Sequence, residues 1–225
     1  LSMVSFSEDL KKSCLDVWEL AHEHHPFVKS MGDGTLSLDR FTYFMKQDYL
    51  FLIDYCRVVA LATAKSDRIS TMGKWSKLLD ETLNIEMDLH RGFCTDIGIN
   101  ILDLDETIPS AATINYTNHL VRTAYEGDVN DIAVSLLPCQ WGYDEIGRRF
   151  YSLDGLNPAS FHARWILGYN NPAYQEMTIW LREYVDSLGN ISSEISRKKM
   201  KDIFHKSTQH ELTFWEDAWN AGSAD

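Results

Sequence analysis

Apolar residues recur at spacings of three and four along most of the chain, which is the periodicity of one buried helix face. Phe6, Leu10 and Trp18 belong to a first stripe, and Ser5 with Glu8 matches the capping box that begins many helices. The segment "HHPFVKSMGDGTLS" is expected to end this helix. Further helices are predicted over about 38–64, 70–96, 110–126, from about 131 through Cys139, 158–188 with a break at "GYNNPAY", and 193–219.

No window alternates apolar and polar residues over the length of a strand, so the sequence predicts an all-α protein. Its 225 residues, 44% of them hydrophobic, can bury a large core, and composition does not differ between the two halves. The prediction is a single-domain helical bundle of seven or eight helices over residues 1–225. Leu1 and Ser2, ahead of Met3, are expected to be a remnant of cloning.

The net charge and the short length of the apolar stretches exclude several classes of partner. The net charge of −12 repels phosphate backbones and anionic lipids, and the basic cluster at residues 197–199 is short, so no nucleic acid is expected to bind. No stretch approaches the roughly 20 apolar residues of a membrane span, and no signal peptide is recognisable. We therefore expect a cytoplasmic protein with no membrane partner. The four cysteines are expected to be free thiols, because no C-x-x-C pair occurs among Cys14, Cys56, Cys94 and Cys139.

The stretch "SLLPCQWGYDEIG" places a proline and a cysteine side by side within a predicted helix. Pro138 lacks an N–H, so the helix is expected to bend there and expose one face locally. Cys139, Gly142 and Tyr143 lie on that face, where the glycine is expected to leave room for a cavity. The alternative is a buried structural thiol, which is the common state of a lone helical cysteine.

Two carboxylates sit among apolar neighbours. Asp48 shares its helix face with Phe44 and Phe51, and Glu211 shares its face with Phe214 and Trp215. An unpaired buried carboxylate is costly, so each must have a partner. A structural hydrogen bond to a Tyr or Trp would satisfy that need, and a catalytic role is the other interpretation.

These residues lie in motifs that resemble the TenA family, also called thiaminase II or aminopyrimidine aminohydrolases. The resemblance spans nearly the whole chain and rests on "HPFVKSMGDGTLSLDRFTYFMKQDY", "EMDLHR", "INYTNHL", "SLLPCQWGYDEIG", "RWILGY" and "HELTFWEDAW". It implies a heme-oxygenase-like bundle, usually a homotetramer, with a homodimer as the alternative. It also implies hydrolysis of thiamin or of 4-amino-5-aminomethyl-2-methylpyrimidine to hydroxymethylpyrimidine, for thiamin salvage.

The resemblance also implies roles for seven residues. Cys139 matches the nucleophile of the family, Glu211 its acid/base group, and Asp48 the carboxylate that holds the amino and ring-nitrogen edge of the pyrimidine. Phe51 matches the ring that stacks on the substrate, where many relatives carry tyrosine. The pocket tyrosines of the family match Tyr116, Tyr143 and Tyr169.

The residue types suit that chemistry. A carboxylate facing the N–C–N edge of an aminopyrimidine accepts from both protons and makes the ring electrophilic. A thiolate adds to the ring and leaves again, while a second carboxylate carries protons to the leaving group and from water. Nothing in this scheme requires a metal or another cofactor.

Three other functions stay open from the sequence. A heme oxygenase-like protein would need an axial histidine, for which His22, His24 and His25 are candidates. A di-iron bundle would need two Glu-x-x-His pairs, whereas only Asp202-x-x-His205 approaches that form and Glu86 and His90 are four apart. A regulatory protein that binds a pyrimidine without turnover is the non-enzymatic alternative.

Overall fold

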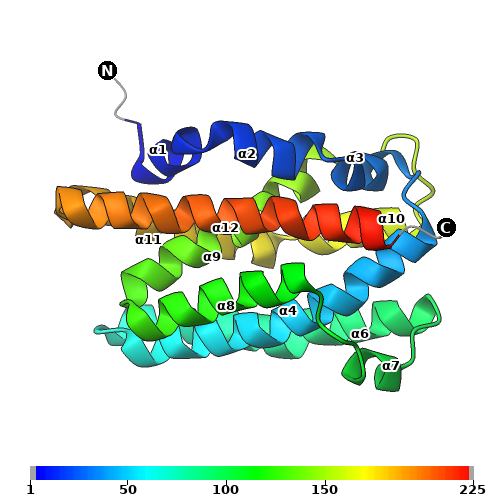
Figure 1. Ribbon diagram of the computed structural model, residues 1–225, viewed down its shortest axis with the longest axis horizontal. Coiled ribbons are helices and arrows are strands. Elements are labelled where there is room, and N and C mark those ends of the chain that lie inside the picture. Colours follow the sequence, from blue (N-terminus) through cyan, green and yellow to red (C-terminus); the bar gives the residue numbers. More distant parts are fainter. Residues whose placement is uncertain (1–3, 223–225) are drawn as a thin grey trace. The chain divides into compact units, whose positions relative to one another are not determined.

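The computed structural model describes residues 4–222, and every regular element in that range is a helix (Figure 1). The all-α prediction is therefore confirmed, while Leu1 and Ser2 lie outside the described residues. None of the helices within residues 4–222 is long and apolar enough to cross a membrane.

The described residues divide into two compact units, and the single-domain prediction stays a prediction. Unit 1 comprises residues 4–36 and 133–216, and unit 2 comprises residues 37–132 and 217–222. The elements of unit 1 are α1 (Phe6–Ser13), α2 (Leu15–Glu19), the π-helical turn η1 (Leu20–His24), α3 (Pro26–Asp33), α10 (Phe161–Tyr169), α11 (Pro172–Ile191) and most of α9 (Val129–Arg149) and α12 (Glu194–Ala221). Those of unit 2 are α4 (Leu38–Lys65), α5 (Ile69–Asp80), the π-helical turn η2 (Glu81–Glu86), α6 (Met87–Asp96), α7 (Ile101–Asp105) and α8 (Ala111–Glu126).

Residues 4–222 contain more helices than the predicted seven or eight. Helices α3 and α7 form in segments to which the apolar pattern assigns none, and the predicted first and third helices are divided into α1 and α2 and into α5 and α6. Pro26 begins α3 instead of ending the first helix, since its fixed φ and missing N–H suit the first helical position. The ring of His25 caps this helix by accepting from the Phe27 N–H at 3.1 Å.

Two helix ends in unit 1 also differ from the prediction. The helix expected to open at Pro158 begins at Phe161, where Ser160 Oγ accepts from the Ala163 N–H at 3.2 Å. The following helix runs past Gly189 to Ile191 instead of stopping before the glycine. A Cβ at Gly189 would lie 2.7 Å from the Phe6 side chain, so this glycine serves close packing of α11 against α1.

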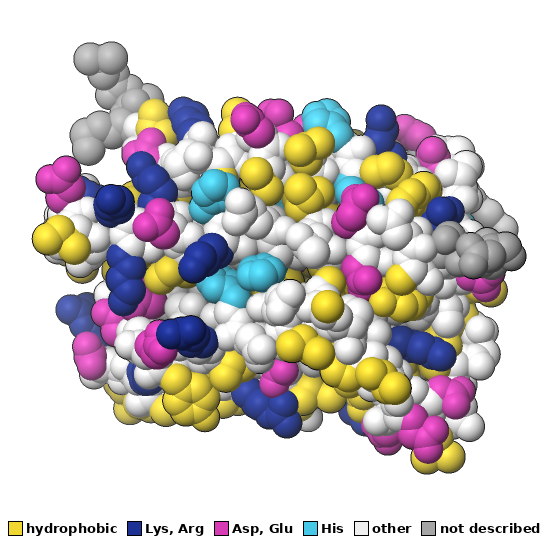
Figure 2. Space-filling view, viewed as in Figure 1, with side chains coloured by type: hydrophobic (Ala, Val, Ile, Leu, Met, Phe, Trp, Pro, Cys, Tyr) yellow, Lys and Arg dark blue, Asp and Glu magenta, His cyan; other side chains and the backbone are white. Residues whose placement is uncertain are grey.

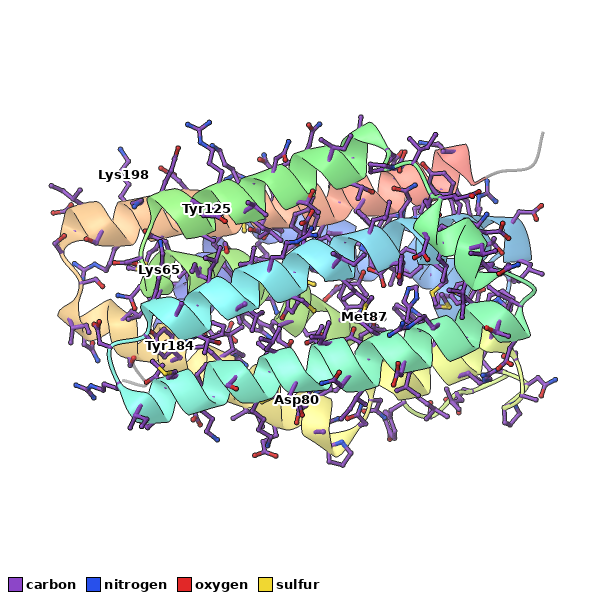
Figure 3. All side chains as sticks on the ribbon, turned by 90° about the horizontal axis from the view of Figure 1, so that it is seen from below. Lys65, Asp80, Met87, Tyr125, Tyr184 and Lys198 are labelled. Carbon is purple, nitrogen blue, oxygen red and sulfur yellow. The ribbon has the colours of Figure 1, made fainter. Side chains whose placement is uncertain are left out.

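In unit 2, polar side chains of α4 satisfy both ends of α8. Gln47 donates to the Ile108 carbonyl at 3.1 Å and accepts from the Ser110 N–H at 3.0 Å, just where α8 begins. Lys65 Nζ donates to the carbonyls of Ala124 at 2.6 Å and Gly127 at 2.7 Å, where α8 ends (Figure 3). Carbonyls at a helix C-terminus have no partner within their own helix, so the ammonium group stabilises the α4–α8 pair.

In unit 1, large aromatic side chains hold α2, α9 and α12 together. Trp18 of α2 stacks on Phe204 of α12 with ring centroids 5.7 Å apart, and contacts Trp141 of α9 at 5.0 Å. Trp18 and Phe204 are completely buried, and Trp141 is nearly so. This core fixes α9 and α12, the two helices that carry the predicted thiol and the predicted acid/base carboxylate.

Candidate active site

Helix α9 continues through Pro138, and α12 supplies a hydrogen bond beside the proline. Pro138 has no N–H for the Val134 carbonyl, which weakens the backbone ladder at this turn. At the next carbonyl, Ser135, the hydroxyl of Ser207 on α12 donates at 2.7 Å, and this bond is buried. The proline turn is thus tied directly to α12.

Two contacts between α9 and α12 lie one helical turn before and one helical turn after the predicted catalytic residues. The first is the hydrogen bond from Ser207 to Ser135. Four residues after Ser135 is Cys139, and four residues after Ser207 is Glu211. Four residues further on, the rings of Tyr143 and Trp215 lie 5.5 Å apart. Both helices run in the same direction, from left to right in Figure 1, and residues four apart share a helix face.

Cys139 and Glu211 therefore occupy the same level of unit 1, one turn beyond the serine pair and one turn before the aromatic pair. Both side chains are buried, with 9% of Cys139 and 3% of Glu211 exposed. The predicted nucleophile and the predicted acid/base group thus lie between the same two contacts that join α9 and α12. The side chains of Trp215 and Ser207 were not predicted for the site, although their i±4 spacing from Glu211 was visible in the sequence.

An aromatic cluster lies beside this pair. The Tyr143 ring is 4.9 Å from the Tyr169 ring and 5.8 Å from the Trp165 ring, and all three side chains belong to unit 1. Tyr143 joins the cluster from α9, whereas Trp165 and Tyr169 come from α10. The two predicted pocket tyrosines of unit 1 are thus neighbours.

Gly142 does not open a cavity, contrary to the expectation from the sequence. A Cβ at this position would overlap the ring of His22, which comes from the π-helical turn η1 and is completely buried. Burial, with smaller contributions from the charges of Arg149 and Lys11, lowers the pKa of His22 from 6.5 to about 3. The space beside the glycine is therefore filled by a neutral imidazole.

The remaining predicted site residues form a second group, in unit 2. Asp48 on α4 is 4% exposed, and its Oδ2 lies 3.5 Å from His90 Nε2 on α6. The Phe51 ring, one turn further along α4, is 4.7 Å from the ring of Tyr116 on α8. A histidine, and not a Tyr or Trp, thus lies next to the buried Asp48 carboxylate.

His90 is a residue whose role sequence reasoning missed. In the sequence, its i, i+4 spacing to Glu86 was considered only for a metal site. Its ring is buried, with Cys94 Sγ 3.7 Å from Nδ1. Within residues 4–222 no cluster of three or more His, Cys, Asp or Glu side chains has an arrangement that could hold a metal ion.

The four cysteines are buried and none forms a disulfide, which confirms the prediction of free thiols. Burial raises the pKa of Cys56 to about 11 and that of Cys94 to about 12, with the charges of Glu86 and Asp48 as the respective second causes. These two thiols are therefore protonated at neutral pH and are poor nucleophiles.

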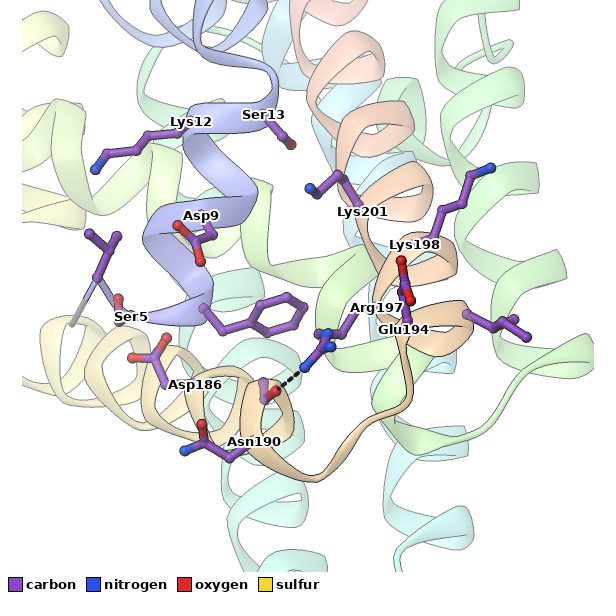
Figure 4. Close-up of a pocket in the computed structure, with 14 residues that line it drawn as sticks. Ser5, Asp9, Lys12, Ser13, Asp186, Asn190, Glu194, Arg197, Lys198 and Lys201 are labelled. Carbon is purple, nitrogen blue, oxygen red and sulfur yellow. Dashed lines mark hydrogen bonds between the residues drawn. The ribbon is translucent and has the colours of Figure 1, made fainter.

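A surface hollow of about 1140 Å³ in unit 1 holds none of the predicted site residues (Figure 4). It lies among α1, α11 and α12, and Arg197 at its edge donates to the Gly189 carbonyl at 3.0 Å. Its lining mixes lysines and arginine with Asp9, Asp186 and Glu194. The visible face in Figure 2 likewise intersperses acidic and basic side chains and shows no extended basic area, as the net charge of −12 leads one to expect.

The helical architecture and the two groups of residues define a class of protein, the all-helical proteins with a heme oxygenase-like fold. The structure matches heme oxygenase-1 from Synechocystis sp. PCC6803 with a TM-score of 0.68 over 97% of this chain and 94% of that one, at 12% identity. This similarity concerns the fold alone. A closer match is a TenA homologue from P. horikoshii OT3, with a TM-score of 0.88 and 26% identity over 98% of this chain and all of that one.

Sequence comparison places the chain within one family of that class. The sequence model of the TENA/THI-4/PQQC family matches residues 12–221, and the chain belongs to this family. A relative from Halalkalibacterium halodurans named aminopyrimidine aminohydrolase is 38% identical over 96% of both chains. Another of the same name, from Bacillus subtilis, is 32% identical over 94% of this chain and 89% of its own. The resemblance predicted from the motifs is confirmed.

Proposed function

We propose that this protein is an aminopyrimidine aminohydrolase (thiaminase II) that releases the substituent from the exocyclic methylene of a 4-aminopyrimidine. The family membership and the relatives named for this activity support the reaction class. The observation that carries the proposal is the placement of a buried thiol, Cys139, and a buried carboxylate, Glu211, between the two contacts that join α9 and α12 in unit 1. The substrates proposed are 4-amino-5-aminomethyl-2-methylpyrimidine and thiamin, and the product is hydroxymethylpyrimidine.

In the proposed mechanism, Asp48 holds the ring. Its carboxylate accepts from the 4-amino group and from a protonated ring nitrogen, which withdraws electrons from the ring carbon to be attacked. Burial strengthens such charge-assisted hydrogen bonds, because little water competes for the carboxylate. Phe51 stacks on the pyrimidine face, and its lack of a hydroxyl preserves stacking while removing one hydrogen-bond donor.

The thiolate of Cys139 then adds to the unsubstituted ring carbon, next to the carbon that bears the methylene. A C–S bond forms, and the displaced electron pair breaks the bond between the exocyclic methylene and the leaving amine or thiazole. Where the amine leaves, Glu211 donates the proton that it needs to depart as ammonia. Water next adds to the methylene and gives a proton to Glu211. The C–S bond breaks, which restores the aromatic ring and the thiolate.

The tyrosines are proposed to bind the substrate without entering the bond-making steps. Tyr143 and Tyr169 pack ring to ring at 4.9 Å, and Tyr116 packs against Phe51 at 4.7 Å. Such packing restricts each ring to one orientation, so its hydroxyl is positioned before substrate arrives. No metal or other cofactor takes part in the proposed reaction.

The experiment that tests this function is an assay of the purified protein with 4-amino-5-aminomethyl-2-methylpyrimidine and, separately, with thiamin. We expect ammonia from the first substrate and hydroxymethylpyrimidine from both. Binding of the pyrimidine without any product would instead support the regulatory alternative. A Soret band in the purified protein would support the oxygenase alternative, for which the similarity in fold is the motivating observation.

The proposal includes a homotetramer in the cytoplasm. Light scattering coupled to size exclusion should then give four times the chain mass of 25.9 kDa. Twice that mass would establish the homodimer alternative.

A further inference from the structure

The residues behind Asp48 form a continuous polar chain within unit 2. Cys94 Sγ lies 3.7 Å from His90 Nδ1, and His90 Nε2 lies 3.5 Å from Asp48 Oδ2. Cys94 is completely buried, and His90 and Asp48 are 6% and 4% exposed. These three side chains thus join α6 to α4 in surroundings from which water is largely excluded.

The two nitrogens of the His90 ring face different groups, Cys94 at Nδ1 and Asp48 at Nε2, and this arrangement favours one tautomer. Burial, followed by the negative charge of Asp48, raises the pKa of Cys94 to about 12, so the thiol keeps its proton and acts as a donor. With the thiol as donor, its neighbour Nδ1 accepts. In the tautomer that accepts at Nδ1, the ring proton lies on Nε2 and faces the Asp48 carboxylate.

An acceptor lies close to the Nε2 proton. No hydrogen bond of standard geometry is made by Nε2, and the nearby acceptor is Asp48 Oδ2. A small rotation of the carboxylate closes this contact, as catalytic hydrogen bonds often tighten when substrate binds. The other oxygen, Oδ1, would then stay available for the substrate.

We propose that Cys94 and His90 are positioning residues that hold Asp48 in the orientation that binds the pyrimidine edge. This role rests on the proposed function of Asp48, and it assigns to a second cysteine a part in the site without contact to the reacting atoms. Cys94 fixes the tautomer of His90, and His90 fixes the rotamer of Asp48. Cys94, His90 and Asp48 neither gain nor lose a proton during turnover.

The first test reads the tautomer and needs no activity. In ¹⁵N-histidine-labelled protein, the two ring nitrogens of His90 should show distinct shifts with the proton on Nε2, and the His90→Gln variant identifies its signals. Cys94→Ala should shift this pattern toward a mixture of tautomers. Cys56→Ala is the matched control, since it removes another buried thiol of unit 2 and should leave the His90 signals unchanged. An unchanged His90 pattern in Cys94→Ala would overturn the role of the thiol.

The second test separates positioning from a merely structural role. His90→Leu should lower kcat/KM by about tenfold to a hundredfold, by analogy with the loss when a group that orients a metal-ligating side chain is removed. Most of the loss should be in KM for a substrate with the 4-amino group. His90→Gln presents an amide N–H near the position of Nε2 and should restore most of the activity. Thermal melting identifies any variant that fails to fold. If His90→Leu does not fold, Cys94→Ala is used instead, and it should raise KM in the same direction but by less.

The outcomes distinguish this inference from the proposed function. If the unmodified protein releases no ammonia, the proposed function fails while the tautomer measurement still stands. If the unmodified protein is active and His90→Leu keeps kcat and KM within twofold, the positioning role is wrong. Equal losses in His90→Leu and His90→Gln, with both variants folded, would also overturn it.

Discussion

The completely buried imidazole of His22 predicts a specific dependence of stability on pH. In the folded protein its pKa is lowered from 6.5 to about 3, first by burial and then by the charges of Arg149 and Lys11. Among residues 4–222 neither nitrogen of the His22 ring has a hydrogen-bond partner, and the ring fills the space beside Gly142. A proton on this ring would be a buried charge without a partner, so the folded state excludes it.

The sign and size of the effect follow from this shift. Below pH 6.5 the unfolded chain binds a proton at His22 that the folded chain does not bind, so stability falls as pH falls. The contribution is fully present above pH 6.5 and decreases toward pH 3. Each pH unit well below 6.5 costs about 1.4 kcal/mol, so His22 alone should remove about 2 kcal/mol between pH 7.5 and pH 5. That loss is a large share of the 5–15 kcal/mol typical of folded proteins, as a rough scale.

The assay is urea unfolding of the unmodified protein and of His22→Leu at pH 7.5, 6 and 5, followed by circular dichroism at 222 nm. The quantity compared is the change of unfolding free energy with pH, so a uniform loss from altered packing does not affect the result. His22→Leu should lose about 2 kcal/mol less than the unmodified protein over this range. His24→Asn is the matched control, because His24 lies in the same turn but its side chain is 58% exposed. Equal pH slopes for His22→Leu and the unmodified protein would refute the reasoning, since they would mean that the folded state accepts the proton.

Four further changes test the site. Cys139→Ser should lower kcat at least ~100-fold in the ammonia assay with pyrimidine binding retained, because a hydroxyl is a far poorer nucleophile than a thiolate, and turnover within a few-fold of normal would end the covalent mechanism. Glu211→Gln should lower kcat by ~10²–10⁴ with a smaller change in KM, whereas a rise in KM alone would assign Glu211 to binding. Asp48→Asn should weaken calorimetric binding by about 1–3 kcal/mol and lower kcat further, and an unchanged kcat would make Asp48 structural. Gly142→Ala should reduce the free energy of unfolding by about 1–3 kcal/mol through overlap with His22, and full stability in urea would show that the imidazole can move aside.

The periodicity of apolar residues was sufficient to predict the fold class. It did not predict every helix boundary, and local chemistry explains the boundaries that differ. The stripes of apolar residues gave α4, α8 and α12 to within one or two residues. Pro26 and Gly189 were interpreted as helix breakers, because their neighbours in space cannot be read from spacing along the chain. A proline at the first helical position and a glycine pressed against Phe6 are both compatible with helix, and the three-dimensional context decides.

The candidate site shows the same division. Cys139 and Glu211 were predicted from residue type and resemblance. Their common level along α9 and α12 follows from contacts one turn away on either side. These contacts join residues far apart in the sequence, so residue spacing could not predict them. Cys94 was expected only to be a free thiol, like Cys14 and Cys56. The His90-x-x-x-Cys94 spacing was available in the sequence, but its meaning depends on Asp48, which comes from another helix.

The matched steps of four residues along α9 and α12 also limit how the chain can change in length. Removing or adding one residue between Ser207 and Trp215 would turn one end of that stretch by about 100° relative to the other. The hydrogen bond to Ser135 and the contact with Tyr143 could then no longer form together, and Glu211 would face another side of its helix. By contrast, the turns at residues 150–160 connect α9 to α10 without regular structure. Insertions should therefore be tolerated in that connection and excluded from the two helical stretches that hold the thiol and the carboxylate.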